Sequence, residues 1–202
     1  MSSISAVIKA IEAGHTDRRI ITVFIDSAKK SSKRREISFL SRKATELGFA
    51  IEFCDAATIS EFTVGSSHGG IIAFCSERSI PTLTKEAIKP NGVYYLLEGV
   101  EDPYNFGYAV RSIYAAGGDG IILTPRNWMG VAGVVARSSA GSSELIDMFV
   151  SEPEDAAQTF KDLGYKVICA GIRDSVSLFD TDLSYPLFVV LGGEKRGISR
   201  AL

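Results

Sequence analysis

The segment LGGEKRGIS, residues 191–199, follows an apolar run and contains three glycines. Glycine lets the backbone approach a ligand closely, so this pattern is typical of a ligand-binding loop. Gly192 and Gly197 have the spacing of a phosphate-binding P-loop, but Ile198 stands where that loop needs a lysine. A P-loop is therefore disfavoured. The loop better suits the adenosine part of a ligand, and a tight turn without any ligand is the plainer alternative.

A second segment, EDPYNFGYAVRSIY at residues 101–114, combines a turn, a helix start and a cation. Asn105 belongs to a residue type that caps helices, and Gly107 allows close approach near the helix start. Arg111 follows Asn105 by about 600° of helical rotation, so the two share no helix face. Taken alone, a surface or salt-bridged position is the usual role of such an arginine. The predicted packing face of this helix consists of Val110, Ile113 and Tyr114.

Composition limits the possible chemistry and location. The chain has 202 residues, of which 46% are hydrophobic, and a net charge of −2, which is typical of globular proteins. Its three cysteines form no Cys-x-x-Cys pair, which argues against a zinc site and suits a reducing compartment. No signal peptide and no apolar run near the ~20 residues of a membrane span are present. We therefore expect a cytoplasmic protein with no metal and no membrane partner.

Basic residues are concentrated between positions 29 and 43, where Glu36 is the single acid. Such a local excess suits the phosphates of a nucleic acid, whereas a solvated helix face is the alternative. The candidate RNA-binding residues are Lys29, Lys30, Lys33, Arg34, Arg35, Arg42 and Lys43.

Helix and strand patterns alternate along the chain and predict an α/β fold in two parts. Residues 1–80 form a small unit with β-rich runs between helical patterns. Residues 81–91 contain two prolines and are predicted to be a linker. In residues 92–202, apolar strands separated by helices predict a parallel sheet covered on both faces. Such sheets bind ligands beyond the carboxyl ends of their strands, where both glycine-containing segments are predicted to lie.

Together these segments resemble the SpoU (TrmH-type) RNA ribose 2′-O-methyltransferases of the SPOUT class. EDPYNFGYAVRSIYAAGGDGIIL resembles their first motif, LGGEKRGIS their second, and ARSSAGSSELI the segment between the two. HGGIIAF resembles part of the family's small ribosomal-protein-like domain, with Gly69 in place of a glutamine. The resemblance covers nearly the whole chain, although Tyr108 stands where the family usually has a small residue.

The resemblance implies S-adenosylmethionine as cofactor, an RNA substrate (ribosomal or else transfer RNA) and a homodimer. It assigns RNA binding to residues 1–80 and methyl transfer to residues 92–202, with Asn105, Arg111 and Glu194 as catalytic residues. A guanidinium keeps its proton in proteins, so we expect Arg111 to bind phosphate and stabilise an alkoxide rather than act as a base. The implied cofactor-binding residues are Ala170, Gly171, Leu191, Gly192, Gly193 and Ile198.

The family's third motif, which contains Ser-Leu-Asn, would be expected shortly after Leu202. In the family this segment threads a loop to form a trefoil knot, so a knot is expected here only if the chain continues past Leu202. A chain that lacks the motif would favour the alternative of a non-catalytic RNA-binding protein on the same fold. A nucleotide-dependent enzyme of Rossmann type is disfavoured because its glycine fingerprint is missing.

Overall fold

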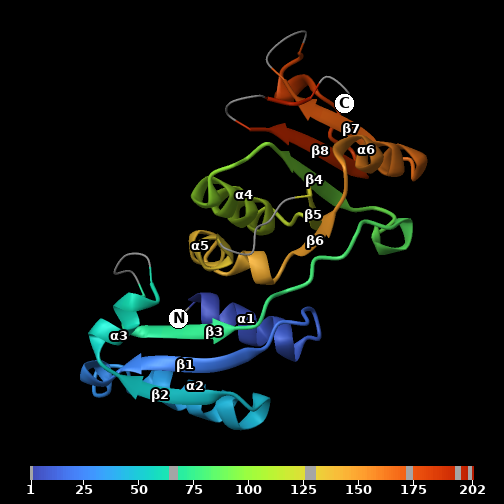
Figure 1. The fold of residues 1–202 in the computed structure, drawn as a ribbon. Helices are drawn as coiled ribbons and strands as arrows, with labels where there is room; N and C mark the ends of the chain where they lie inside the picture. The colour runs from blue at the N-terminus through green and yellow to red at the C-terminus, as the bar shows by residue number, and fades with distance from the viewer. Residues whose placement is uncertain (1, 64–67, 126–130, 172–174, 194–196, 200–201) are drawn as a thin grey trace. The chain divides into compact units, whose positions relative to one another are not determined.

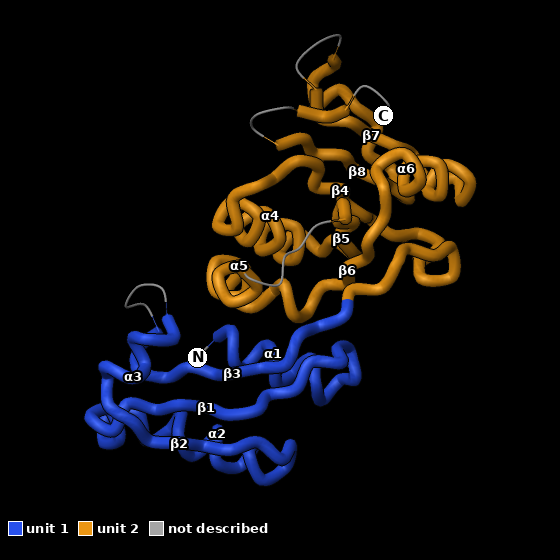
Figure 2. The backbone as a smooth tube through the Cα atoms, in the orientation of Figure 1, with its two compact units in different colours: residues 1–79 blue, residues 80–202 orange. Residues whose placement is uncertain are grey.

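The structure is a computed structural model that describes residues 2–63, 68–125, 131–171, 175–193, 197–199 and 202. The chain divides into two compact units, Met1–Ser79 and Ile80–Leu202 (Figure 2). Within the described ranges, no helix is long and apolar enough to cross a membrane.

The first unit is a small mixed sheet with helices (Figure 1). Strand β1 lies between the other two, parallel to β2 and antiparallel to β3. Val23 and Ile25 of β1 are fully buried in a core with Ile8 of α1 and Leu40 of α2. The elements are α1 (Ser2–Glu12), β1 (Ile20–Asp26), η1 (Ser27–Lys29), α2 (Arg34–Leu47), β2 (Ala50–Cys54), α3 (Ala56–Glu61) and β3 (Ile71–Cys75).

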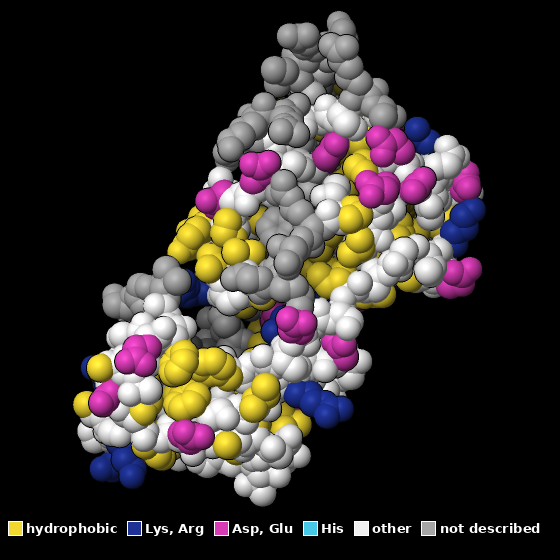
Figure 3. Space-filling model, viewed as in Figure 1, with side chains coloured by type: hydrophobic (Ala, Val, Ile, Leu, Met, Phe, Trp, Pro, Cys, Tyr) yellow, Lys and Arg dark blue, Asp and Glu magenta, His cyan; other side chains and the backbone are white. Residues whose placement is uncertain are grey.

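Aromatic side chains from three elements gather in the first unit. Phe24 of β1, Phe62 after α3 and Phe74 of β3 have ring centroids 4.9 to 6.1 Å apart. Hydrophobic side chains are visible over β1 and β3 on the face drawn in Figure 3. Phe62 and Phe74 remain partly exposed, so this cluster is a smaller one at the surface of the unit.

The second unit contains a five-stranded sheet in which every pairing is parallel, which confirms the predicted fold class. The strand order is β6-β5-β4-β8-β7. Its elements are η2 (Lys85–Ala87), β4 (Val93–Glu98), α4 (Pro103–Ala115), β5 (Gly120–Leu123), α5 (Ala132–Ser138), η4 (Ser142–Glu144), β6 (Asp147–Val150), α6 (Pro153–Asp162), β7 (Lys166–Ala170), η5 (Leu178–Asp180) and β8 (Leu187–Gly192).

Helices cover both faces of this sheet. On one face, Phe160 of α6 stacks on Phe188 of β8 with ring centroids 4.1 Å apart. On the other face, Phe106, Val110 and Ile113 of α4 pack in a core with β5 and α5. The strands are apolar along their length because both of their faces are buried.

Residues predicted to be a linker are hydrogen-bonded to β6. The amide of Val150 donates to the carbonyl of Pro81, and the amide of Leu83 donates to the carbonyl of Val150, both at 2.9 Å. The segment therefore runs beside the edge strand of the second unit rather than free of it.

Candidate cofactor and RNA sites

The neighbouring strands β4 and β8 bring distant parts of the sequence together at the carboxyl edge of the sheet. Glu98 at the end of β4 is in register with Gly192 of β8, and Leu191 is in register with Ala170 of β7. The chain leaves β4 toward β5, whereas β8 and β7 lie on the other side of β4. Such a reversal of strand order creates a crevice at which open parallel sheets bind their ligands.

Glu98 anchors the glycine-containing loop after β8. The amide of Gly193 donates to the Glu98 carbonyl oxygen at 2.6 Å, and the amide of Ser199 donates to Glu98 Oε2 at 3.0 Å. The amide of Gly197 also donates to the carbonyl of Gly193 at 3.0 Å. The loop is thus folded over the end of β4. Our sequence interpretation missed Glu98, although an acid that closes the apolar run VYYLLE is a visible signal.

The glycines of this loop are required by contacts within the chain. A Cβ on Gly193 would lie 2.1 Å from the carbonyl oxygen of Gly99, and a Cβ on Gly192 would lie 2.4 Å from the carbonyl carbon of Gly197. Gly197 itself has a φ of +65°, which L-residues rarely adopt. The predicted reason for these glycines was close approach to a ligand. The structure also requires them because backbone packs closely on backbone here.

The candidate cofactor residues form an accessible surface beside this anchored loop. Ala170 and Gly171 are exposed, and Leu191 and Ile198 are half-buried. Ser199 Oγ is buried and makes no hydrogen bond with the described part of the chain. Leu191 packs against the core beneath α4 and Ile198 against the core beneath α6, so the candidate residues lie around the end of β8. Glu194 lies outside the described residues, within which no group of three or more His, Cys, Asp or Glu could hold a metal.

Helix α4 begins at Pro103, and its cap is a different residue from Asn105. Asp102 is the N-cap, and its Oδ1 accepts from the amides of Tyr104 and Asn105, both at 2.8 Å. The prediction that Asn105 caps the helix is therefore wrong. Asp102 directly precedes Pro103, which is pre-shaped for the first helical position, so the helix starts there.

Asn105 and Arg111 are both exposed on α4. The Arg111 guanidinium makes no hydrogen bond or ion pair with other described residues, so its charge is available to a ligand. Val110 and Ile113 pack inward as predicted, but Tyr114 does not, because its side chain is 43% exposed. Phe106 takes the third inward position, since residues three and four apart share a helix face.

The segment ARSSAGSSELI packs against α4. A Cβ on Gly107 would lie only 1.8 Å from Ser138 Oγ, so the two helices touch at this glycine. Ser138 Oγ is within hydrogen-bond distance of the Pro103 carbonyl at 3.3 Å and of the Val134 carbonyl at 2.9 Å. The four serines of this segment are buried, namely Ser138, Ser139, Ser142 and Ser143. They are linked by hydrogen bonds such as the 3.1 Å bond between the hydroxyls of Ser139 and Ser143. It therefore positions the helix that carries Arg111.

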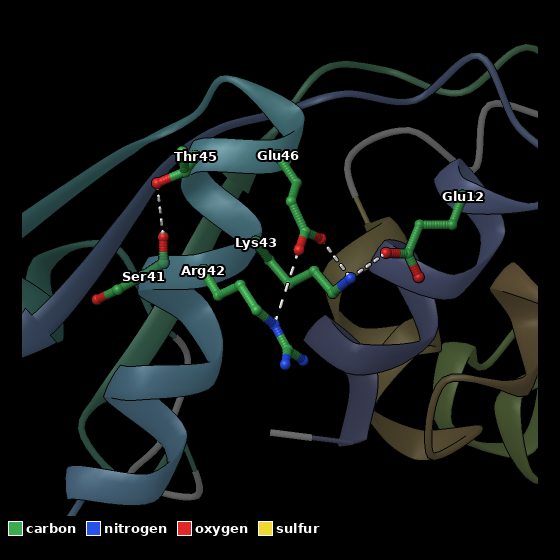
Figure 4. A network of polar contacts seen from close by, with 6 residues as sticks. All are labelled: Glu12, Ser41, Arg42, Lys43, Thr45 and Glu46. Atoms are coloured by element: carbon green, nitrogen blue, oxygen red, sulfur yellow. Dashed lines mark hydrogen bonds and ion pairs between the residues drawn. The ribbon is translucent and has the colours of Figure 1, made fainter.

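Ion pairs, most of them between residues three or four apart, divide the candidate RNA-binding residues into two groups. Lys43 bonds to Glu12 of α1 and to Glu46, and Arg42 Nε lies 3.7 Å from Glu46 (Figure 4). The hydrogen bonds to Glu12 and Glu46 raise the pKa of Lys43, and the bond from Lys43 lowers the pKa of Glu46. Lys33 pairs with Glu36 at 3.2 Å. These three cations are balanced by carboxylates.

The other four cations lie before α2 and in its first turn. Lys29, Lys30, Arg34 and Arg35 are exposed and form no ion pair within the described ranges. Lys30 Nζ lies 4.7 Å from the centre of the Phe53 ring. The uncompensated positive charge of this run is therefore confined to its first half.

Comparisons with known proteins agree with this architecture. Residues 92–202 match the SpoU rRNA Methylase family. A relative from Shewanella oneidensis, named 23S rRNA (guanosine-2′-O-)-methyltransferase RlmB, is 28% identical over 96% of this chain and 80% of its own length. A putative TrmH family tRNA/rRNA methyltransferase from Staphylococcus saprophyticus is 26% identical over 96% and 78%, respectively. An AdoMet-bound rRNA methyltransferase from Sinorhizobium meliloti has a TM-score of 0.76 at 22% identity and covers 96% of this chain and 70% of its own.

The fold, together with these matches, defines an RNA methyltransferase of the SpoU/TrmH type in the SPOUT class. Because the match covers more than half of the chain, the chain belongs to the SpoU rRNA methylase family.

Proposed function

We propose that this chain transfers a methyl group from S-adenosylmethionine to a ribose 2′-hydroxyl of ribosomal RNA. The observation that carries the proposal is the loop that Glu98 holds over the carboxyl ends of β4 and β8. The printed name of the Shewanella oneidensis relative supports ribosomal RNA, and that of the Staphylococcus saprophyticus relative makes transfer RNA the second candidate.

The cofactor would be held by Ala170 at the end of β7 and Gly171 just after it, and by Leu191 of β8 and Ile198 of the loop that follows β8. S-adenosylmethionine supplies a methyl group activated by a sulfonium. The Ser199 hydroxyl, which is buried and has no hydrogen-bond partner among the described residues, is proposed to donate a hydrogen bond to the adenosine. Glu194 is proposed to hold the loop.

Arg111 is proposed as the catalytic cation. A 2′-hydroxyl loses its proton as it reacts, so negative charge develops on the ribose oxygen beside a phosphate. A positioned guanidinium stabilises such charge without having to give up its own proton. The exposed guanidinium of Arg111 fits this role because no described carboxylate neutralises it. Asn105, two turns earlier on α4, would orient the ribose.

The test is the methylation of purified cellular RNA with labelled S-adenosylmethionine, followed by mapping of the modified ribose. Arg111→Ala should lower the rate of methyl transfer by about 10²- to 10³-fold, because it removes one group that stabilises developing charge. Lys161→Ala, at an exposed cation of α6, is the matched control and should keep full activity. Full activity in Arg111→Ala would refute the assignment.

We also propose that the enzyme works as a homodimer in the cytoplasm. Val176, Leu178 and Phe179 lie between β7 and β8 with exposed side chains, and Phe179 is 96% exposed. Such apolar surface is typical of a region covered in an oligomer. Light scattering of the purified protein measures the oligomeric state.

A protein that binds RNA but transfers no methyl group to any RNA would support the alternative of a non-catalytic RNA-binding protein.

A further inference from the structure

We propose that a hollow at the start of α2 holds one unpaired nucleotide of the RNA substrate. The hollow has a volume of about 530 Å³ and is lined by Lys30, Ser31, Arg34, Ile37 and Ser38. This inference rests on the proposed function only in that the ligand is RNA. Beyond that function, the inference specifies where on this chain the RNA is bound and how one of its nucleotides is recognised.

The lining has the chemistry of a nucleotide site. It offers an ammonium, a guanidinium and two hydroxyls but no carboxylate, so it favours an anion such as a phosphodiester. The half-buried side chain of Ile37 supplies an apolar floor. A nucleobase can stack on such a surface and on the plane of the Arg34 guanidinium. The volume falls within the range of roughly 300–1,000 Å³ seen for small-ligand sites.

The two cations that line the hollow are among those that tertiary contacts leave uncompensated. Neither Lys30 nor Arg34 forms an ion pair with a described residue, whereas Lys33, Arg42 and Lys43 each contact a glutamate. The Phe53 ring lies 4.7 Å from Lys30 Nζ and so holds the ammonium in place. The structure thus neutralises the neighbouring cations and keeps these two available.

The start of α2 is also built in a way that a bound anion would improve. The helix begins with Arg34 and Arg35, where the helix dipole favours negative groups. Its N-cap, Lys33, makes no side-chain capping hydrogen bond, whereas the cap of α3, Asp55, accepts from Thr58. The one acid in the first turn, Glu36, is paired with Lys33, so a phosphate in the hollow would add negative charge at this end of the helix.

The hollow selects unpaired RNA because a base in a double helix hides both of its faces in the stack. A free mononucleotide shares the same chemistry, so the experiment must separate these two sources. Inorganic phosphate would engage Lys30 and Arg34 but would leave the Ile37 floor uncovered.

The first test blocks the hollow without changing any charge. Ser38→Leu places a larger side chain in the lining, and Ser41→Leu places the same side chain at an exposed position on α2 outside it. Leucine suits a helix better than serine, so both variants should fold. We expect Ser38→Leu to weaken binding of a labelled single-stranded octaribonucleotide about tenfold or more, as when one stacked base is excluded. Ser41→Leu should bind like the wild type in the same anisotropy assay.

The second test separates two contributions of Arg34 to RNA binding, namely the stacking of its planar guanidinium and its positive charge. Arg34→Lys should lower affinity while the dependence on salt stays the same, and Arg34→Ala should also reduce the salt slope by about 0.7. Arg42→Lys is the control, because Arg42 already contacts Glu46. Unchanged affinity in Ser38→Leu, equal binding of a duplex of the same sequence, or tighter binding of adenosine monophosphate than of the octamer would each overturn the proposal.

Methyl-transfer assays on the same proteins distinguish this proposal from the proposed function. If the wild type binds the octamer through the hollow but methylates no RNA, the proposed function fails and the nucleotide site stands. If the wild type methylates RNA and Ser38→Leu keeps full octamer affinity, the nucleotide site fails and the proposed function stands.

Discussion

Replacing Gly107 with alanine should destabilise the protein, although alanine is the better helix former. A Cβ at this position would lie 1.8 Å from Ser138 Oγ and 2.8 Å from Ser138 Cβ, well inside ordinary van der Waals contact. The helices α4 and α5 would have to move apart. Overpacking of this kind costs about 1–3 kcal/mol, which exceeds the gain of about 0.5–1 kcal/mol in helix propensity.

Gly133→Ala is the matched control because Gly133 also lies in a helix, α5, and its Cβ would meet nothing within 4 Å. This variant should stabilise the protein by about 0.5 kcal/mol. Urea unfolding measures both free energies of unfolding from the midpoint and slope of each transition. The two substitutions should therefore shift the midpoint in opposite directions. Shifts in the same direction would refute the explanation of Gly107 by helix contact.

A double-mutant cycle identifies the contact that is responsible. Ser138→Gly removes the two closest side-chain atoms, so Gly107→Ala should cost less in that background than in the wild type. We expect a coupling free energy of about 1 kcal/mol or more between the two positions. Methyl transfer should follow stability in this series, since α4 carries Arg111. Absence of coupling would show that Ser138 is not the group that Gly107 accommodates.

Two other predictions concern the carboxyl edge of the sheet. Gly193→Ala should weaken binding of S-adenosylmethionine at least about tenfold by calorimetry, because its Cβ would lie 2.1 Å from the Gly99 carbonyl oxygen and move the loop; unchanged affinity would show that the loop does not form the cofactor site. The hydrogen bond from Lys166 lowers the pKa of Asp182 to about 2, so carboxyl NMR should find its midpoint there rather than near 3.8. Because this pKa is lowered on folding, the associated stabilisation is complete above the ordinary value of 3.8 and disappears as the pH falls through about 2. A midpoint near 3.8 would contradict that contact.

Several elements could be predicted because their signals are local. Apolar runs of a few residues gave the parallel strands, and Gly48 after α2 adopts the left-handed conformation that ends a helix. The two family motifs could be recognised because each is a continuous stretch of sequence. The match to residues 92–202 confirms that recognition.

Contacts between distant residues were beyond the reach of the pattern. The charges of Arg42 and Lys43 look free in the sequence, yet Glu12 of another helix meets Lys43 in the fold. The position of Glu98 at the end of an apolar run marks it as unusual, but it does not show that Glu98 accepts from Gly193 and Ser199, about 100 residues away. The sequence suggested Asn105 as the cap of α4, whereas the cap in the structure is Asp102.

The sequence by itself determined the α/β class, the family and the residues that carry polar chemistry, because propensity and motif spacing are properties of neighbours along the chain. Only the tertiary structure decided that β8 lies between β4 and β7, which places Gly192 beside Glu98 and folds the loop over that edge. It also decided which cations remain without a carboxylate. The strand pairing and the bond between Lys43 and Glu12 join residues far apart in sequence, and local patterns carry no information about such partners.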